Sequence, residues 1–177
     1  MAALTIVAAA TVPTPATASA PAATHERALT STCAPSSGTK TFHSYDERSK
    51  GNVRMCVGGE GRPDGTRAIR AHLSGDFFYQ WVGLWYDDCP SECNLNGHFT
   101  LTDTSTGATS QSPYLSKIWG GNRNGSLTHT FEVSSGIYKI SFSGRKYGGY
   151  WRDGRFQSSD TDDEMSISGL EVTVDIS

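Results

Sequence analysis

Short runs in which hydrophobic and polar residues alternate, divided by glycine-rich turns, make up most of the chain from residue 41 onward. In the run 67–73, apolar side chains alternate with basic ones, a pattern typical of a strand with one buried face. The run 165–176 alternates in the same way, but its phase slips at Gly169. A bulge or a bend is therefore expected at that glycine.

The run 77–86 gives the strongest strand signal of the chain, and both of its faces are apolar. It predicts either a central strand that is covered on both sides or a strand that presents aromatic side chains to a ligand. Aromatic rings can stack on the C–H faces of sugars, but large aromatic side chains also dominate protein cores. The candidate binding residues are Tyr79, Trp81, Trp85, Tyr150 and Trp151. The alternative interpretation is that these side chains belong to the hydrophobic core.

Four short signals predict tight turns beyond this run. Ser134–Gly136 divides two alternating runs and predicts a hairpin, and Asp153-Gly154 predicts another. Asn96-Gly97 and Asn124-Gly125 predict two further turns. About nine or ten short strands with this spacing predict an all-β fold, a two-sheet antiparallel sandwich that is jelly-roll-like.

The first 22 residues are predicted to be a secretory signal peptide, because an apolar run is followed by small residues in an A-x-A-like pattern. The apolar run has roughly 11 residues, whereas a helix needs about 20 to span a bilayer. Residues 23–40 are rich in Pro, Ala, Ser and Thr and are predicted to form a flexible N-terminal arm. The sandwich domain is then expected over residues 41–177 of a secreted, extracellular protein with no membrane anchor after cleavage.

Four cysteines, Cys33, Cys56, Cys89 and Cys93, are expected to form disulfides in the oxidising medium outside the cell. They allow three pairings, and the most economical one joins Cys33 to Cys56 and Cys89 to Cys93. Since Cys33 lies in the predicted arm, the alternative is a covalent bridge from Cys33 to another secreted protein. A zinc site made from all four is disfavoured, because the C-x3-C spacing has no second pair to match it.

The charge of the chain narrows the choice of partner. Its 18 acidic and 15 basic side chains give a formal net charge of −3. Nucleic acids and anionic membranes both require a positive surface. Neither is therefore expected as a partner.

An acidic run between two predicted strands is the candidate metal site, because calcium takes several carboxylate oxygens from such loops. The run lacks the glycine and the distal glutamate of the EF-hand pattern, so a solvated loop is the favoured interpretation and no cofactor is expected. Its carboxylates are Asp160, Asp162, Asp163 and Glu164.

No catalytic motif is found in the sequence. The five histidines are isolated, and there is no G-x-S-x-G elbow, H-E-x-x-H pair or P-loop. A hydrolase that uses two carboxylates, Asp87 or Asp88 with Glu92, is the least favoured class. The chain is therefore not expected to be an enzyme.

The favoured interpretation is a secreted binding module, an adaptor or structural subunit of an extracellular assembly of other secreted proteins. Its arm would dock in a groove of the partner by strand addition or through Cys33. The alternative is a lectin-like module that binds carbohydrate through its aromatic residues.

The Ala/Thr/Pro-rich leader, the segment that carries Cys33 and the small glycine-rich sandwich together resemble exported actinomycete proteins such as the adaptor subunit of umbrella toxin particles. The resemblance covers the architecture of the whole mature chain and rests on no diagnostic motif. It implies a protein that links a lectin-like subunit to a stalk-bearing toxin chain.

Overall fold

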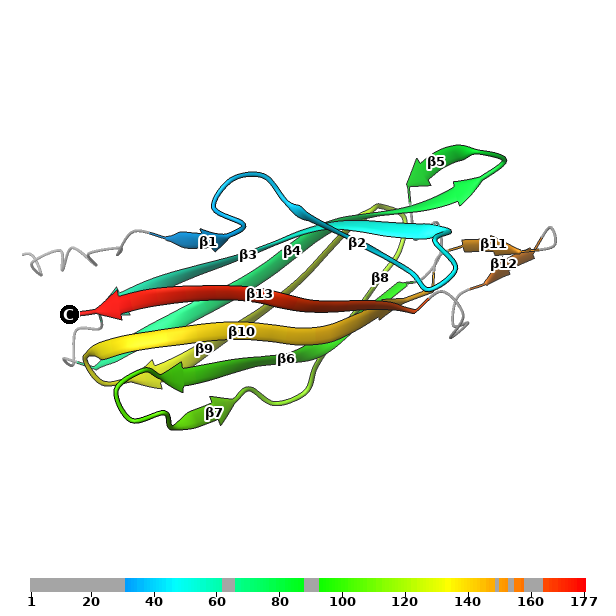
Figure 1. Cartoon of the computed structure of the whole chain (residues 1–177). Coiled ribbons are helices and arrows are strands. Elements are labelled where there is room, and N and C mark those ends of the chain that lie inside the picture. Colours follow the sequence, from blue (N-terminus) through cyan, green and yellow to red (C-terminus); the bar gives the residue numbers. More distant parts are fainter. Residues whose placement is uncertain (1–30, 62–65, 88–92, 149, 153–154, 158–163) are drawn as a thin grey trace, which may run out of the picture.

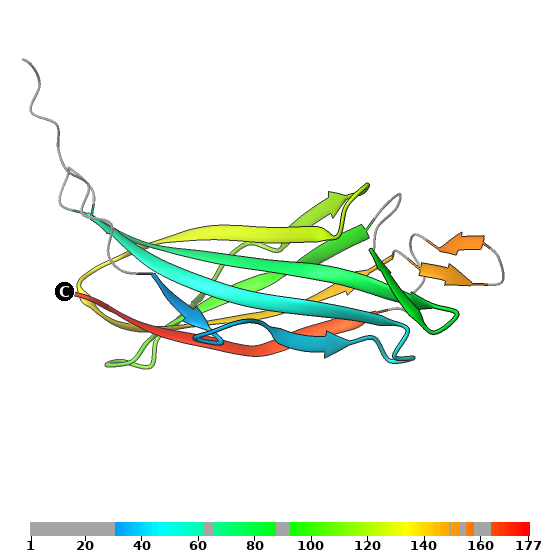
Figure 2. The same ribbon diagram turned by 90° about the horizontal axis from the view of Figure 1, so that it is seen from above.

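The computed structural model describes residues 31–61, 66–87, 93–148, 150–152, 155–157 and 164–177 (Figure 1). Every regular element in these segments is a β-strand. Two antiparallel sheets pack face to face as an elongated sandwich (Figure 2). The predicted two-sheet antiparallel sandwich is therefore confirmed. The described residues contain no helix that is long and apolar enough to cross a membrane.

The first sheet is built on the long hairpin of β3 and β4, which pair along their full length. Two short strands, β1 and β2, pair one after the other with the outer edge of β3, while β9 and β5 share the far edge of β4. The strands of this sheet are β1 (Thr32–Ala34), β2 (Lys40–His43), β3 (Ser49–Gly61), β4 (Arg67–Trp81), β5 (Leu84–Asp87) and β9 (Asn124–Val133).

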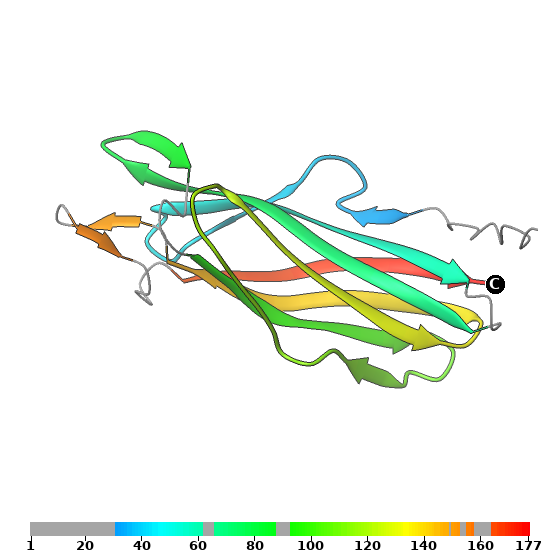
Figure 3. The same cartoon turned by 180° about the vertical axis from the view of Figure 1, so that it is seen from behind.

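The second sheet places β10 at its centre, between β13 and β6. Both β7 and β8 pair with the outer edge of β6 (Figure 3). Its strands are β6 (Cys93–Asp103), β7 (Thr109–Gln111), β8 (Leu115–Trp119), β10 (Gly136–Tyr147) and β13 (Met165–Ile176); a separate two-stranded sheet consists of β11 (Tyr150–Arg152) and β12 (Arg155–Gln157).

One core lies between the two sheets, and it follows from the alternation along the strands. Every second residue of β3 from Ser49 to Gly59 is buried, and β10 and β13 show a similar alternation. Removal of these apolar faces from water supplies about 25 cal/mol per Å² and holds the sheets together. Large side chains that are fully buried come from both sheets, among them Met55, Ile69, Leu73, Phe77, Leu95, Phe99, Ile140 and Ile167.

The turn predictions have mixed outcomes. The hairpin across Asp153-Gly154 is confirmed by the pairing of β11 with β12. The hairpin across Ser134–Gly136 is wrong, because β9 belongs to the first sheet and β10 to the second, so the chain crosses between sheets there. The turn at Asn96-Gly97 is also wrong, since both residues lie inside β6.

The predicted phase slip at Gly169 is confirmed. The register of β10 against β13 shifts between Phe142 and Gly144, and Gly169 has a φ of 67°. That backbone conformation is open to glycine and costs other residues energy. The bulge lets β13 turn apolar side chains toward the core on both sides of the slip.

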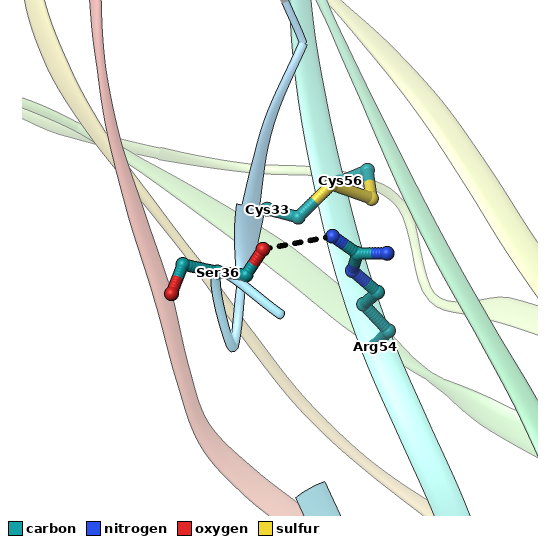
Figure 4. The surroundings of a disulfide bond; sticks show 4 residues. All are labelled: Cys33, Ser36, Arg54 and Cys56. Carbon is teal, nitrogen blue, oxygen red and sulfur yellow. Dashed lines mark hydrogen bonds between the residues drawn. A yellow bond between two sulfur atoms is a disulfide. The ribbon is translucent and has the colours of Figure 1, made fainter. Parts of the chain in front are cut away.

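The described end of the predicted arm belongs to the sandwich. β1 pairs with β3, so that Cys33 lies opposite Cys56, and the two cysteines form a disulfide (Figure 4). Arg54 donates a hydrogen bond to the carbonyl oxygen of Ser36 at 3.0 Å and holds the next turn of the chain. The domain boundary at residue 41 is therefore corrected, because residues 32–34 and 40 are strand residues; residues 23–30 lie outside the described part.

The predicted intrachain pairing of Cys33 with Cys56 is confirmed, and it leaves Cys33 no free thiol for a bridge to another protein. Cys33 is not available for a bridge to another protein because the backbone pairing of β1 with β3 places it opposite Cys56. Cys93, the first residue of β6, is also disulfide-bonded. Cys89, the remaining cysteine, lies outside the described residues.

Candidate functional site

The run 77–86 folds into a hairpin instead of one continuous strand. Trp81 and Leu84 are register partners at the ends of β4 and β5, so Val82 and Gly83 form a two-residue turn. Their φ angles are 50° and 76°, and a turn with two positive φ angles matches the twist of the flanking strands. Gly83 adopts this conformation without strain. The signal that could have shown the turn is this glycine inside an apolar run.

Val82 is the strained residue of the turn. A β-branched side chain with a positive φ is an outlier, and such a conformation costs about 1–3 kcal/mol. Strain of this kind persists where the surrounding structure imposes it, and it is concentrated at functional positions. The tip of the hairpin therefore holds Val82 in a backbone conformation that its side chain disfavours.

The tip is also hydrophobic and exposed. The exposed fractions of Val82, Leu84 and Trp85 are 79%, 62% and 37%. We call these three residues the hairpin tip surface. The hairpin projects from the end of the sandwich that lies away from the C-terminus (Figure 1). Leu84 and Trp85 are successive residues of β5 and therefore point to opposite faces, so the tip exposes apolar side chains on both sides of a projecting element, which makes it a candidate interaction site.

The structure separates the aromatic residues that the sequence placed in one binding row. Tyr79 points into the sandwich with an exposed fraction of 8% and stacks on Tyr86, with ring centroids 5.5 Å apart. Trp85 pairs with Gln80 across the hairpin and lies on the opposite, outer face with Phe78. Tyr79 and Trp85 lie on opposite faces because the chain reverses at Val82 and Gly83. The prediction of a single continuous strand did not include this turn.

The other three candidates are only partly described. Trp81 ends β4, but its side chain lies outside the described part of the structure. Tyr150 and Trp151 belong to β11, which contacts β4, and their side chains also lie outside it. The backbone therefore places β11 beside the strand that leads to the tip, at the same end of the sandwich (Figure 3).

Two cations pack on the aromatic side chains behind the tip. The ammonium group of Lys50 lies 4.0 Å from the centre of the Trp85 ring and 5.5 Å from that of Phe78. The guanidinium group of Arg123 lies 5.5 Å from the Phe78 ring and pairs with Asp76 at 3.8 Å. Each exposed cation–π contact contributes about 0.5–1 kcal/mol. Lys50 thus covers one face of the Trp85 ring and fixes its position.

A loop of the first sheet supports the base of the hairpin. The backbone N–H of Gln80 donates to the carbonyl oxygen of Arg48 at 2.6 Å, which ties β4 to the loop between β2 and β3. Tyr45 in this loop is 96% exposed. The base of the hairpin is thus held by the body of the domain.

The candidate metal site is described only at its last residue. Glu164 forms a two-point pair with Arg145, with oxygen–nitrogen distances of 3.1 and 3.2 Å. Asp160, Asp162 and Asp163 lie outside the described residues. Among the residues that the structure describes, no group of three or more His, Cys, Asp and Glu is arranged to hold a metal ion.

The candidate carboxylates for hydrolysis cannot be placed as a pair. Asp87 ends β5, and its side chain, like Asp88 and Glu92, lies outside the described part of the chain. His72 lies on the outer face of β4, with Nδ1 2.8 Å from the Thr128 hydroxyl. Partial burial, and then the charge of Arg70, lowers the pKa of His72.

No protein-family model matches the chain, and no curated protein or solved structure matches it.

Proposed function

We propose that this chain is a secreted, non-enzymatic binding module that serves as an adaptor in an extracellular protein assembly. The hairpin tip surface is its docking site for a protein partner. The observation that carries the proposal is the combination of exposed apolar side chains and a strained backbone at Val82. This combination costs stability in the free chain, and burial of the tip against a partner would offset part of that cost.

A protein partner fits the tip better than a sugar does. Val82 and Leu84 are aliphatic and make up most of the exposed apolar part of the tip, whereas sugar recognition requires a free aromatic face together with hydrogen-bonding groups. One face of Trp85 is covered by Lys50, and Tyr79 is buried. A rigid hairpin with an aromatic anchor and a basic rim is typical of a protein contact that has a small hydrophobic centre.

The disulfide supports the extracellular part of the proposal. The bond between Cys33 and Cys56 closes a loop with a sequence separation of 23 residues, and such bonds persist in oxidising compartments. With Cys33 bonded within the chain, association with the partner is non-covalent.

The test uses the secreted protein in its native complex. The chain is purified from the culture medium of the secreting cells, and the mass of the species is measured by size-exclusion chromatography with light scattering. We expect the wild-type chain in a larger complex and the Leu84→Asp variant as a free monomer. Ile137→Asp is the matched control, since Ile137 is 47% exposed at the start of β10, the end of the sandwich from which the hairpin does not project. A Leu84→Asp chain that remains in the complex would refute the proposal.

A further inference from the structure

A polar pocket of about 410 Å³ lies on the outer face of the second sheet. Strands β6, β10 and β13 supply most of its lining, and Tyr114, between β7 and β8, forms one wall. Its volume falls in the range of small-molecule sites, about 300–1,000 Å³. Its lining includes the polar side chains of Asn96, His98, Tyr114, Arg145, Tyr147 and Ser166.

Asn96 is an unsatisfied polar residue at the back of this pocket. Its side chain is 2% exposed, and its Nδ2 donates to the hydroxyl of Tyr147. Its Oδ1 is closed off from bulk water and has no hydrogen-bond partner among the residues that the structure describes. If the amide is turned by 180°, its nitrogen takes the same place, so one polar atom is left unpaired either way. Buried polar groups are paired in the great majority of cases, so this exception leaves one hydrogen bond that a ligand could supply.

The backbone around Asn96 is shaped by two glycines. Gly97 and Gly144 face each other across β6 and β10, and a Cβ atom on Gly144 would lie 2.1 Å from the carbonyl oxygen of Asn96. Gly97 has a φ of 147°, which residues with a side chain rarely adopt. The bulge of β10 against β13 lies at the same level. Bulges next to sites re-aim side chains, and here the close approach of the two strands places Asn96 behind the pocket.

The groups around the mouth of the pocket are aromatic and hydroxylated. The ring of Tyr114 is 64% exposed and meets the ring of His98 edge-on, with centroids 6.0 Å apart. Partial desolvation, and then a hydrogen bond with Tyr147, raises the pKa of Tyr114. An exposed side chain of this kind changes rotamer within nanoseconds. Rotation of Tyr114, which lines the same pocket as Asn96, would widen the mouth of the pocket for a ligand.

The charge of the pocket limits the class of ligand. Among the described residues that line it, Arg145 is the only Arg, Lys, Asp or Glu, and Glu164 neutralises it through the two-point pair. This lining therefore offers an anion or a cation no unpaired Arg, Lys, Asp or Glu side chain. The amide, the two tyrosine hydroxyls and the serine hydroxyls instead offer both donors and acceptors, and the Tyr114 ring offers an apolar face.

We infer that this pocket is a second binding site, which takes a neutral, hydroxyl-rich ligand of the size of one sugar ring. One hydroxyl of the ligand supplies the missing hydrogen bond of Asn96, and the Tyr114 ring packs on the C–H face of the sugar. The site is independent of the hairpin tip surface, which lies on the other sheet.

The experiment follows the side-chain amide of Asn96 by ¹H–¹⁵N NMR while glucose, galactose, mannose or N-acetylglucosamine is added to the intact protein. We expect at least one of these sugars to shift the Asn96 amide signals saturably. The Tyr114→Ala variant should bind that sugar roughly tenfold more weakly, because it loses the ring contact. Tyr45→Ala, which removes a 96% exposed tyrosine elsewhere, should bind as the wild type does.

Three results would overturn the inference. Either none of the four sugars shifts the Asn96 amide saturably, or Tyr114→Ala binds as tightly as Tyr45→Ala. A high-resolution crystal structure grown with the sugar that shows only a water molecule on the Asn96 amide would have the same consequence. Leu84→Asp should leave sugar binding unchanged, so that failure of this inference and failure of the docking proposal are distinguishable.

Discussion

Lys50 and Trp85 are in contact although their strands are not neighbours. The ammonium nitrogen of Lys50 on β3 lies 4.0 Å from the ring centre of Trp85 on β5, and β4 runs between them. Lys50 is the register partner of Phe78, while Trp85 faces Gln80, so the lysine reaches diagonally across β4. This contact joins the hairpin to the middle of the first sheet.

A double-mutant cycle measures this contact. Lys50→Met and Trp85→Ala are combined, and the free energy of unfolding is measured by urea denaturation. We expect a coupling of about 0.5–1 kcal/mol, the usual strength of a cation–π contact at the surface. Lys139→Met with Trp85→Ala is the control, because Lys139 pairs with Glu171 on the second sheet and should show no coupling. Equal couplings in the two cycles would contradict the geometry of the hairpin.

Val82→Asn separates the strain of the turn from its role in docking. Asparagine tolerates a positive φ, and Asn-Gly is the preferred sequence for such a turn. The variant should therefore raise the free energy of unfolding by about 1 kcal/mol, while it weakens the complex because the tip loses an apolar side chain. Denaturation and the light-scattering measurement report the two effects. A variant that is less stable than the wild type would show that Val82 is not strained.

Gly144→Ala tests the close approach behind the polar pocket. The new Cβ would lie 2.1 Å from the Asn96 carbonyl oxygen, so β6 and β10 must separate. We expect a loss of about 2–3 kcal/mol in the free energy of unfolding, as for other overpacked sites. Gly58→Ala is the matched control, because among the described residues, its two chain neighbours aside, none has a heavy atom within 4 Å of its Cβ position. It should change stability by no more than about 0.5 kcal/mol. Similar losses in both variants would argue against the close contact.

His72 makes stability depend on pH in the acid range. Partial burial and the charge of Arg70 hold the pKa of His72 below its ordinary value of 6.5. As the pH falls below 6.5, the unfolded chain binds a proton that the folded chain does not, so the stability falls until the folded-state pKa is passed.

The difference in the free energy of unfolding between the wild type and His72→Gln isolates this effect. It should be constant above pH 7 and should decrease on the acid side of pH 6.5. A difference that increases toward acid pH would mean that protonated His72 is stabilised in the fold.

The sequence pattern was sufficient for the fold class, because alternation of apolar residues reports directly on which side chains face a core. It was misleading at Val82 and at Asn96. A lone glycine in an apolar run did not stand out as a turn, and Asn96-Gly97 has the composition of a turn but lies within β6. In that strand Gly97 has no side chain, which lets β6 lie close to β10 at Gly144. Such an approach depends on residues far apart in the chain, which local patterns do not contain.

The division between sheets was also outside the reach of local patterns. Ser134–Gly136 has the composition of a hairpin turn, but β4 pairs with β9 and β13 pairs with β10. These long-range pairings place β9 in the first sheet and β10 in the second. The pairing of Cys33 with Cys56 was predicted correctly from economy alone, while the strand pairing that enforces it was not.

The most direct test of the docking proposal is site-specific photo-crosslinking in the secreting cells. A benzophenone amino acid replaces Leu84 in one chain and Ile137, beside the C-terminal end of β13, in another. We expect a discrete crosslink to one secreted protein from position 84 and none from position 137. The absence of a crosslink from position 84 in a complex that still forms, or an equal crosslink from both positions, would contradict docking through the hairpin tip surface.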